Sequence, residues 1–277
     1  MLVVSSLVFG LMAFTAKRAT LHLPGPEVAF VRFLIGLGAV AVVIAAGVRL
    51  RPVNWGGLFL RGFFGGLAVL GYFLTIAHLP VGTATLLNYI APVFTAVFAA
   101  LFLGERISLV TGIALLLTFA GVILVVRGHA APGELGFGRW EACGIASALL
   151  SGAAVTTIRA VRRTDGSWEI FTAFCLVGAL ATAPMALHDW ITPTAGDWLL
   201  LAAVGLLSVL AQVLFIYALR YVRAATSGVI SQLTPVTALF LGAVLLDEPL
   251  GAVALFGSVV TLAGVALGAR PSEAPRT

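Results

Sequence analysis

The chain has 277 residues, of which 61% are hydrophobic and 10% are charged, and its formal net charge at pH 7 is +5. Its mean hydropathy of +1.12 is typical of a membrane protein and excludes an ordinary soluble domain. A positive net charge can indicate a nucleic-acid partner, but the distribution of the basic residues, described below, favours a membrane topology signal instead.

Ten apolar segments follow one another along the chain. About 20 helical residues cross about 30 Å of hydrocarbon. Segments nearly free of charge fall at 2–16, 28–48, 62–79, 82–103 and 108–126, and then at 140–158, 168–187, 197–219, 224–246 and 251–269. The first segment lacks a basic n-region and a cleavage site, so we expect a retained helix and not a signal peptide. The sequence therefore predicts an all-α membrane protein with ten transmembrane helices.

The pattern of segments is duplicated. Residues 83–127 align with residues 226–270 at a constant offset of 143 residues, which places Pro92 on Pro235 and Glu105 on Glu248. Five spans in each half is an odd number, so the second half must enter the bilayer from the opposite side. Inverted repeats are typical of secondary transporters, whose substrate sites lie at the repeat interface near the midplane.

This duplication predicts two inverted five-helix repeats around a central cavity. We expect the first repeat at 1–128, a connecting loop at 129–138, the second repeat at 139–270 and a cytoplasmic tail at 271–277.

The basic residues are divided unevenly between the two sides of the membrane. Eleven fall on the side of the termini and the even-numbered loops, four fall on the opposite side, and Arg32 lies inside a span. The positive-inside rule then places both termini in the cytoplasm. We expect membrane lipid and a small-molecule substrate as partners, no nucleic acid, and a monomer.

Motifs for enzymatic or ATP-driven chemistry are missing from the sequence. Lys17 is the only lysine, and no Gly-rich phosphate-binding loop precedes it. There is no G-x-S-x-G elbow, no His pair with metal-ligand spacing and no aspartate in the middle of a span. Cys143 and Cys175 lie within spans, where we expect small packing residues. The sequence predicts no enzyme, no metal and no cofactor.

Pro92 and Pro235 fall near the bilayer centre in the fourth and ninth spans, about 15 Å from the start of each span. A proline removes one backbone hydrogen bond and clashes with the carbonyl four residues back, so we expect a kink in each helix. These carbonyls belong to Asn88 and Ser231. A freed carbonyl at membrane depth must be buried in protein or face a water-filled cavity, so both spans are expected to line the central pathway.

The candidate substrate-binding residues are polar side chains at the kinks and in neighbouring spans. Each has a simpler alternative: Asn and Gln can hold helices together, Tyr can anchor a span end, and Arg32 can snorkel to an interface. The functional alternative for Arg32 is an anchor for a substrate carboxylate, or a gate. The set comprises Tyr72, Asn88, Tyr89, Gln212, Tyr217, Ser231, Gln232 and Arg32, with Pro92 and Pro235 as kink or gating residues.

Glu105 and Glu248 close the fourth and ninth spans on opposite faces. A negative charge at a helix C-terminus is unfavourable to the macrodipole, so a compensating contact is required. We expect a structural role, either pairing across helices or capping a neighbouring helix N-terminus. No acidic residue lies in the middle of a span, which argues against strong proton coupling.

Together these residues resemble the drug/metabolite transporter superfamily, EamA type. Each repeat has a mid-helix proline, a glutamate at the following helix end and an Ala-Gly-Val triplet in the fifth span, at 120–122 and 263–265. The pair Arg32-Phe33 is similar to the same pattern. The run at 88–92 resembles the branch of amino-acid exporters that moves aromatic amino acids, although Ala91 departs from the aromatic residue often found there.

This resemblance implies a cavity formed by spans three, four, eight and nine, and export to the periplasm by alternating access. We therefore expect a multi-pass exporter of the bacterial inner membrane that moves small metabolites, above all amino acids. The alternatives are a proton-coupled multidrug or other metabolite exporter of the same superfamily, an intramembrane enzyme, and a structural or sensory protein. The proton-coupled exporter would need a titratable group in the pathway. The enzyme would need a nucleophile with a base, and the structural or sensory protein would need a partner surface in the loops.

Overall fold

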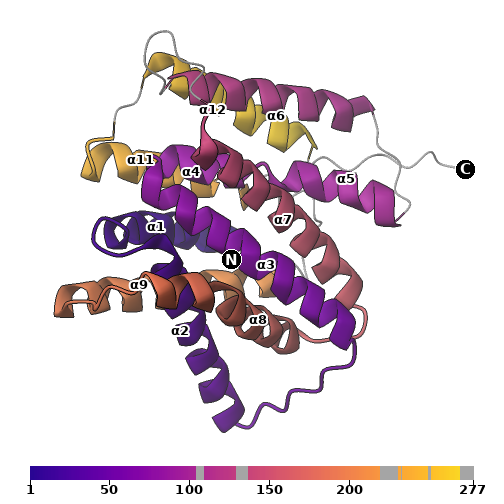
Figure 1. Ribbon diagram of the computed structural model, residues 1–277. Helices are drawn as coiled ribbons and strands as arrows, with labels where there is room; N and C mark the ends of the chain where they lie inside the picture. The colour runs from indigo at the N-terminus through magenta and orange to yellow at the C-terminus, as the bar shows by residue number, and fades with distance from the viewer. Residues whose placement is uncertain (104–108, 129–136, 219–229, 232, 249–250, 269–277) are drawn as a thin grey trace, which may run out of the picture.

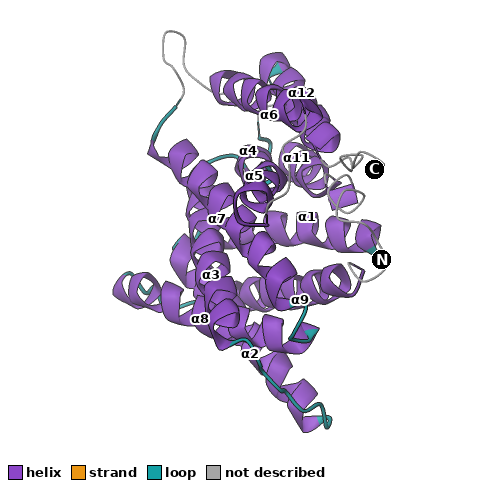
Figure 2. Ribbon diagram, turned by 90° about the vertical axis from the view of Figure 1, so that its right-hand side faces the viewer, coloured by secondary structure: helices purple, strands orange, loops and turns teal. Residues whose placement is uncertain are grey.

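Helices of the computed structural model follow the predicted apolar segments closely (Figure 1). The structure describes residues 1–103, 109–128, 137–218, 230–231, 233–248 and 251–268. In these residues the secondary structure is helical and contains no strand (Figure 2). The helices are α1 (Leu2–Ala19), α2 (Gly25–Ala45), α3 (Trp55–His78), α4 (Val81–Asn88), α5 (Ala91–Leu103), α6 (Leu109–Gly128), α7 (Arg139–Val161), α8 (Ser167–His188), α9 (Ala195–Ala218), α11 (Leu233–Leu245) and α12 (Ala252–Gly268).

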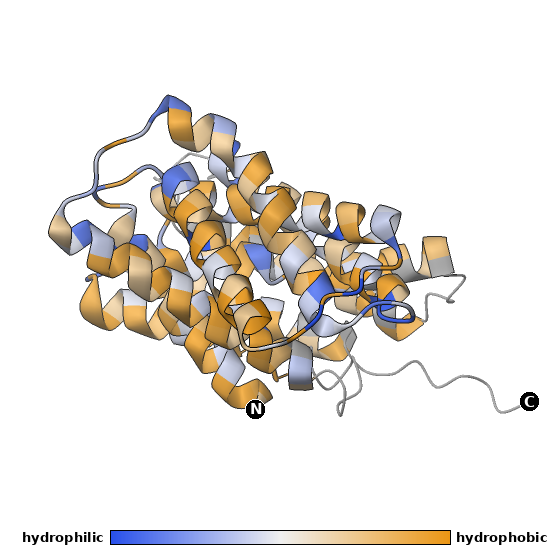
Figure 3. Cartoon of the chain, turned by 90° about the horizontal axis from the view of Figure 1, so that it is seen from below, coloured by the Kyte–Doolittle hydropathy of each residue, from blue (hydrophilic) through white to orange (hydrophobic). Residues whose placement is uncertain are grey.

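The surface of the bundle is that of a multi-pass membrane protein. Seven helical spans in the described residues are long and apolar enough to cross a membrane, with α4 and α5 counted together, and shorter apolar helices accompany them. Large apolar side chains such as Leu34, Phe63, Leu180 and Leu206 are exposed on these helices. In Figure 3 hydrophobic residues dominate the helices. A soluble protein would bury such surface, whereas lipid covers it at no cost.

Two helices begin earlier than the predicted spans. Helix α3 starts at Trp55 and not at residue 62, because the Asn54 side chain accepts a hydrogen bond from Gly57 N–H and caps the helix. Helix α2 starts at Gly25, with Pro26 in its first turn. The predicted spans begin directly after Arg61 and Glu27 because both residues are charged. Both residues lie inside helices and are buried, so the prediction was wrong for Arg61, which is one of the eleven basic residues counted on the side of the termini and the even-numbered loops.

The fourth span is broken and not merely kinked. Helix α4 ends at Asn88 and α5 begins at Ala91, so Tyr89 and Ile90 form a tight turn in which Ile90 N–H donates to Leu87 O at 3.3 Å. Pro92 then lies in the first turn of α5. The N–H groups of a first turn have no acceptor within the helix, so the N–H that proline lacks removes no helical hydrogen bond there. Pro235 lies in α11, and the described residues 230–231 before that helix are also helical.

The last helices of the two repeats show that the repeats are inverted. Helices α6 and α12 pack tightly together (Figures 1 and 2). A Cβ on Gly121 would overlap Thr261, and a Cβ on Gly264 would overlap Thr118. The contact on α12 moves back from 264 to 261 as α6 advances from 118 to 121, so the helices are antiparallel. An offset of 143 residues converts one contact into the other, which confirms two equivalent helices of opposite direction.

A matched pair of hydrogen bonds repeats the same relation between the two halves. Ser5 Oγ on α1 donates to Ala211 O on α9 at 2.8 Å, and Ser147 Oγ on α7 donates to Ala68 O on α3 at 2.7 Å. The serines are 142 residues apart and the carbonyls 143. Helix α1 packs on α9 and α11, just as α7 packs on α3 and α5. Each repeat is therefore held mainly by the other one.

A pseudo-twofold axis relates the two repeats, and it passes between α2 and α8. A Cβ on Gly36 would come within 2.6 Å of Cys175 Sγ, and a Cβ on Gly178 within 2.5 Å of the Phe33 ring. These contacts again run in opposite directions along the two helices. In an inverted repeat this axis lies in the membrane plane near mid-depth. Arg32, whose equivalent at the offset of 142 that relates these contacts is Phe174, therefore lies near the middle of the membrane.

Candidate functional site

Polar side chains gather around the broken fourth span. Tyr72 on α3 is buried, and its hydroxyl lies 2.9 Å from Thr85 Oγ1 on α4. Thr85 Oγ1 already donates to Val81 O at 2.7 Å, so Tyr72 is the donor to Thr85. The Tyr72 hydroxyl is thereby fixed against the half-helix that ends at the break.

The two residues at the break both bond to the second repeat. Asn88 Oδ1 accepts a hydrogen bond from Ser151 Oγ on α7 at 3.2 Å, and the Tyr89 hydroxyl bonds to the Thr234 side chain on α11. Asn88 and Tyr89 are both only partly buried. Since Pro92 has no N–H, the Asn88 carbonyl also lacks its usual helical donor. The break thus joins polar groups from both halves of the molecule.

Arg32 is buried beside this group. It is 6% exposed, its Nε donates to Ser208 Oγ on α9, and its Nη1 is buried with no hydrogen-bond partner. Its guanidinium carbon lies 5.3, 5.9 and 5.6 Å from the ring centroids of Phe33, Phe73 and Phe174. Arg32 is close enough to Tyr72 for the two to interact electrostatically. Its depth and its buried partners do not fit a side chain that snorkels to an interface.

A second buried arginine, Arg61, lies on α3. It is also 6% exposed, and its guanidinium carbon lies 4.2 Å from the centroid of the same Phe174 ring. Its Nε is buried with no hydrogen-bond partner. A Cβ on Gly65 would overlap Arg61 Nη1, so this glycine makes the room that Arg61 occupies. Sequence reasoning missed Arg61 because it was placed outside the third span; its position one residue before Gly62-x-x-x-Gly66 was the available signal.

The two arginines have no counter-charge in the described part of the chain. No carboxylate there lies within 4 Å of either guanidinium, since the one ion pair found is His188 with Asp189 on the surface. A charged residue at the bilayer centre costs about 2.5–3.5 kcal/mol on insertion scales. Aromatic faces offset part of that cost. The Cys175 thiol, which interacts with both arginines, supplies no charge while it is protonated.

The remaining predicted residues are less closely involved. Gln212 on α9 and Ser231 are partly buried. Tyr217 is 43% exposed at the end of α9, as expected for an interface anchor. Gln232 and Glu105 lie outside the described residues.

Glu248 caps the short helix α4. Both of its carboxylate oxygens accept a hydrogen bond from Val81 N–H, at 2.8 and 2.9 Å. Lys17 Nζ, which interacts electrostatically with Glu248, donates to Ile76 O and Leu79 O at the end of α3. An anion at a helix N-terminus and a cation at a helix C-terminus both match the helix dipoles. This contact is of the kind that a structural role for Glu248 requires.

One buried carboxylate was not foreseen. Glu27 in the first turn of α2 is 0% exposed; its Oε2 accepts from Ile191 N–H at 3.0 Å, and its Oε1 is buried with no partner. Asp197 at the start of α9 is near enough to interact with it. The sequence survey counted only the middle of the predicted spans and therefore passed over Glu27.

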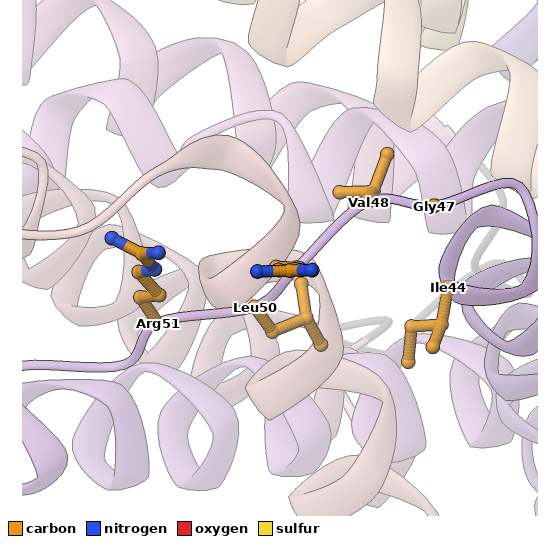
Figure 4. A pocket seen from close by; sticks show the side chains of 6 residues that line it. Ile44, Gly47, Val48, Leu50 and Arg51 are labelled. Carbon is orange, nitrogen blue, oxygen red and sulfur yellow. The ribbon is translucent and has the colours of Figure 1, made fainter.

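A shallow hollow of about 560 Å³ lies at the end of α2 and along the α2–α3 loop (Figure 4). It is lined by Ile44, Gly47, Val48, Arg49, Leu50 and Arg51. None of the predicted site residues lines it, and its arginines are exposed. Its wide opening and solvated charges make it a surface depression and not a substrate chamber.

Comparisons with known proteins agree on one family. Residues 1–127 and 138–269 each match the profile described as the EamA-like transporter family. The chain is 32% identical over 213 residues to the pseudopaline exporter CntI of Pseudomonas aeruginosa strain PAO1, covering 76% of this chain and 74% of that one. It is 31% identical over 196 residues to a probable terminal-alkyne amino-acid exporter of Streptantibioticus cattleyicolor, covering 69% and 64% of the two chains.

The fold is also found in a solved crystal structure. It matches with a TM-score of 0.66 at 22% identity, covering 96% of this chain and 95% of the other. This likeness supports the helical arrangement described above.

Proposed function

The chain belongs to the EamA-like transporter family, and on that premise we propose that it exports small amphipathic metabolites, above all amino acids, from the cytoplasm by alternating access. It is a membrane transporter and not an enzyme. The observation that carries the proposal is a buried, uncompensated Arg32 near the pseudo-twofold axis, within electrostatic reach of Tyr72, whose hydroxyl bonds to α4 of the broken fourth span. Exporters among the relatives support the direction of transport.

In this proposal the substrate carboxylate binds Arg32. A guanidinium with free N–H groups matches the two oxygens of a carboxylate. The ammonium end of an amino acid would bind the freed carbonyl and side chain of Asn88, because half-helix C-terminal ends carry partial negative charge. Tyr72 and Tyr89 would bound the side chain of the substrate. Each of these contacts comes from an element that the repeat interface brings together.

The hydrogen bonds between the repeats support the proposal of alternating access. Tyr89 bonds to Thr234 in the other repeat, and Asn88 bonds to Ser151 there. A substrate that replaces these hydrogen bonds would loosen one contact between the repeats and allow them to rock. We place the bundle in the bacterial inner membrane with both termini in the cytoplasm. Arg61 leaves the count of loop charges, but the excess on the cytoplasmic side is unchanged in sign.

A proton-coupled exporter is the second candidate, and Glu27 favours it. Its buried, unpartnered Oε1 near Asp197 is the sort of group that a proton relay uses. Counterflow without a pH gradient, compared with uptake under an imposed gradient, separates the two candidates. Facilitative export predicts equal initial rates with and without the gradient, and proton coupling predicts that Glu27→Gln removes the difference.

The proposal is tested by transport in proteoliposomes. We expect Asn88→Ala and Gln232→Ala each to lower the initial rate of amino-acid counterflow by about fivefold, the value of one lost hydrogen bond of about 1 kcal/mol. The folded yield should not change. Ser258→Ala, which removes a hydroxyl bonded to Ala254 O within α12, is the matched control. Unchanged rates in both site variants would refute the site assignment.

A further inference from the structure

Arg61 has no role in the proposal above, yet it is buried in the same region as Arg32. It lies on α3 where that helix packs on α8, under a ring that it shares with Arg32. Because both guanidinium carbons lie over the Phe174 ring, at 5.6 and 4.2 Å from its centroid, their separation is no greater than the sum of these distances. Two like charges have thus been placed close together inside a membrane bundle.

The donors of this pair are only partly used. Arginine has five N–H donors in a fixed fork. Ser208 takes one donor of Arg32, while Arg32 Nη1 and Arg61 Nε are buried and unpartnered. Buried donors without partners are rare because each one carries a desolvation penalty. A structural arginine would be expected to bond to carbonyls or carboxylates nearby, and these two do not.

The surroundings define the chemistry of the missing partner. The walls around the pair are the faces of Phe33, Phe73 and Phe174, together with the Cys175 thiol. Aromatic walls suit an organic ligand with a carbon skeleton better than a hydrated inorganic ion. A single carboxylate can neutralise only one of two guanidinium groups. A ligand that satisfies both must carry two negative charges on a partly apolar frame.

We propose that Arg32, Arg61 and Ser208 form a two-arginine anion site, and that the transported metabolites carry at least two carboxylates. This rests on the proposed function, since it names the substrate class of that transporter. One carboxylate binds Arg32 and Ser208, and the second binds Arg61 on the other side of the shared Phe174 ring. A neutral amino acid with one carboxylate leaves Arg61 unpaired and is a poorer substrate.

The test uses the purified full chain in detergent, with chloride replaced by gluconate. The probes are L-glutamate, which has two carboxylates, L-glutamine, which has the same shape and one carboxylate, and inorganic phosphate. We expect the wild type to bind L-glutamate at least tenfold more tightly than L-glutamine, and Arg61→Met to reduce that ratio to near one. Arg159→Met, which removes an exposed arginine on α7, should keep the ratio.

A second readout separates binding from a structural role. If Arg61 is an unpaired charge kept for ligand, Arg61→Met without ligand should unfold about 2 °C higher or more than the wild type. If Arg61 holds the fold together, the same variant should unfold at a lower temperature, which overturns the proposal. Gly65→Ala, which displaces the Arg61 guanidinium but keeps its charge, should also lower the L-glutamate preference.

Three results would overturn the inference: an unchanged preference in Arg61→Met, phosphate binding as tight as that of L-glutamate, or no L-glutamate binding by the wild type. Counterflow distinguishes this failure from failure of the exporter proposal. Wild-type exchange of L-glutamine as fast as L-glutamate leaves the exporter standing and removes the two-carboxylate site. Tight, Arg61-dependent L-glutamate binding without exchange of any amino acid supports the two-carboxylate site and refutes the exporter proposal.

Discussion

Asp165 shows how one side chain can hold two loops together at the membrane surface. It lies between α7 and α8 and is 6% exposed. Its Oδ1 accepts from Val53 N–H at 2.7 Å, and its Oδ2 accepts from Asn54 N–H at 3.1 Å and from Thr164 Oγ1 at 2.6 Å. Burial acts to raise the pKa of Asp165, but these hydrogen bonds outweigh it and hold the pKa below its usual value. The ionised carboxylate therefore fixes the start of α3.

This contact predicts an acid-sensitive element of stability. Because the pKa of Asp165 is lower in the folded protein, its contribution is present above the unfolded pKa of about 3.9 and is lost as the pH falls through the folded pKa. Asp165→Asn should lower the free energy of unfolding at pH 7 by about 1 kcal/mol and flatten the loss of stability below about pH 4. Thermal unfolding at a series of pH values measures both. Asp189→Asn, at an exposed carboxylate, should change neither; an equal effect there would refute the role of Asp165.

At the residue scale the sequence identified candidates but not their surroundings. Arg32, Tyr72 and Asn88 were selected because polar groups are rare in apolar spans, and the structure brings Arg32 and Tyr72 together. Arg61 and Ser208 were missed for a physical reason. A window that stops at a charge cannot tell a loop arginine from a buried one, because that difference depends on the ring and the glycine that face it from the folded bundle.

Among the elements, the short helix α4 depends most on contacts outside itself. It has eight residues, too few to be stable alone in water or lipid, and no side chain of its own caps its start. Glu248 supplies that cap from the end of α11, and Lys17 holds the preceding turn from α1. Contacts from two other segments thus position the half-helix that ends at Asn88.

Removal of the cap should loosen α4 without disturbing the bundle. We expect Glu248→Ala to lower the free energy of unfolding by about 1–2 kcal/mol, the usual value of a cap with a favourable dipole interaction. The exchange of the Val81 amide with deuterium should become faster, which mass spectrometry of peptides from 79–88 would detect. Glu248→Gln retains an acceptor and should show a smaller change. Equal exchange in the wild type and Glu248→Ala would contradict the capping role.

The break between α4 and α5 was predicted in position but not in form. Proline chemistry places a disturbance near Pro92, and the polar residues Asn88 and Tyr89 beside it indicated exposure to a pathway. Whether a proline kinks a helix or begins a new one depends on whether other elements can bind the freed groups. Here Ser151 and Thr234, both far away in the sequence, bind the residues at the turn, and that could not be predicted from local spacing.

For the whole molecule, the duplication could be predicted from the sequence because matching residues of the two halves lie at a constant offset. The odd number of spans then required inversion, and the antiparallel contacts of α6 with α12 confirm it. The bounds of repeats and connecting loop stay predictions. The packing of each repeat mainly on the other one was not predictable from the offset, since it depends on glycines and serines at helix crossings.

Inversion predicts that equivalent loops lie on opposite faces of the membrane. Leu21 follows α1 and Thr164 follows α7, at an offset of 143, and both are exposed. In a background with Cys143 and Cys175 replaced by alanine, Leu21→Cys should react with a membrane-impermeant maleimide in intact spheroplasts. Thr164→Cys should react only after lysis. Labelling of both from the same face would show that the two repeats share one orientation.

Val204, fully buried on α9, occupies the position that corresponds to Arg61. If the two halves were identical, the substrate concentration for half-maximal transport would be the same on both sides of the membrane. A guanidinium found in just one half removes that equivalence, because a positive charge on α3 favours anions while the buried valine on α9 does not. We expect the two faces to load at different cargo concentrations, because Arg32 and Arg61 both lie in the first repeat and have no charged counterpart in the second.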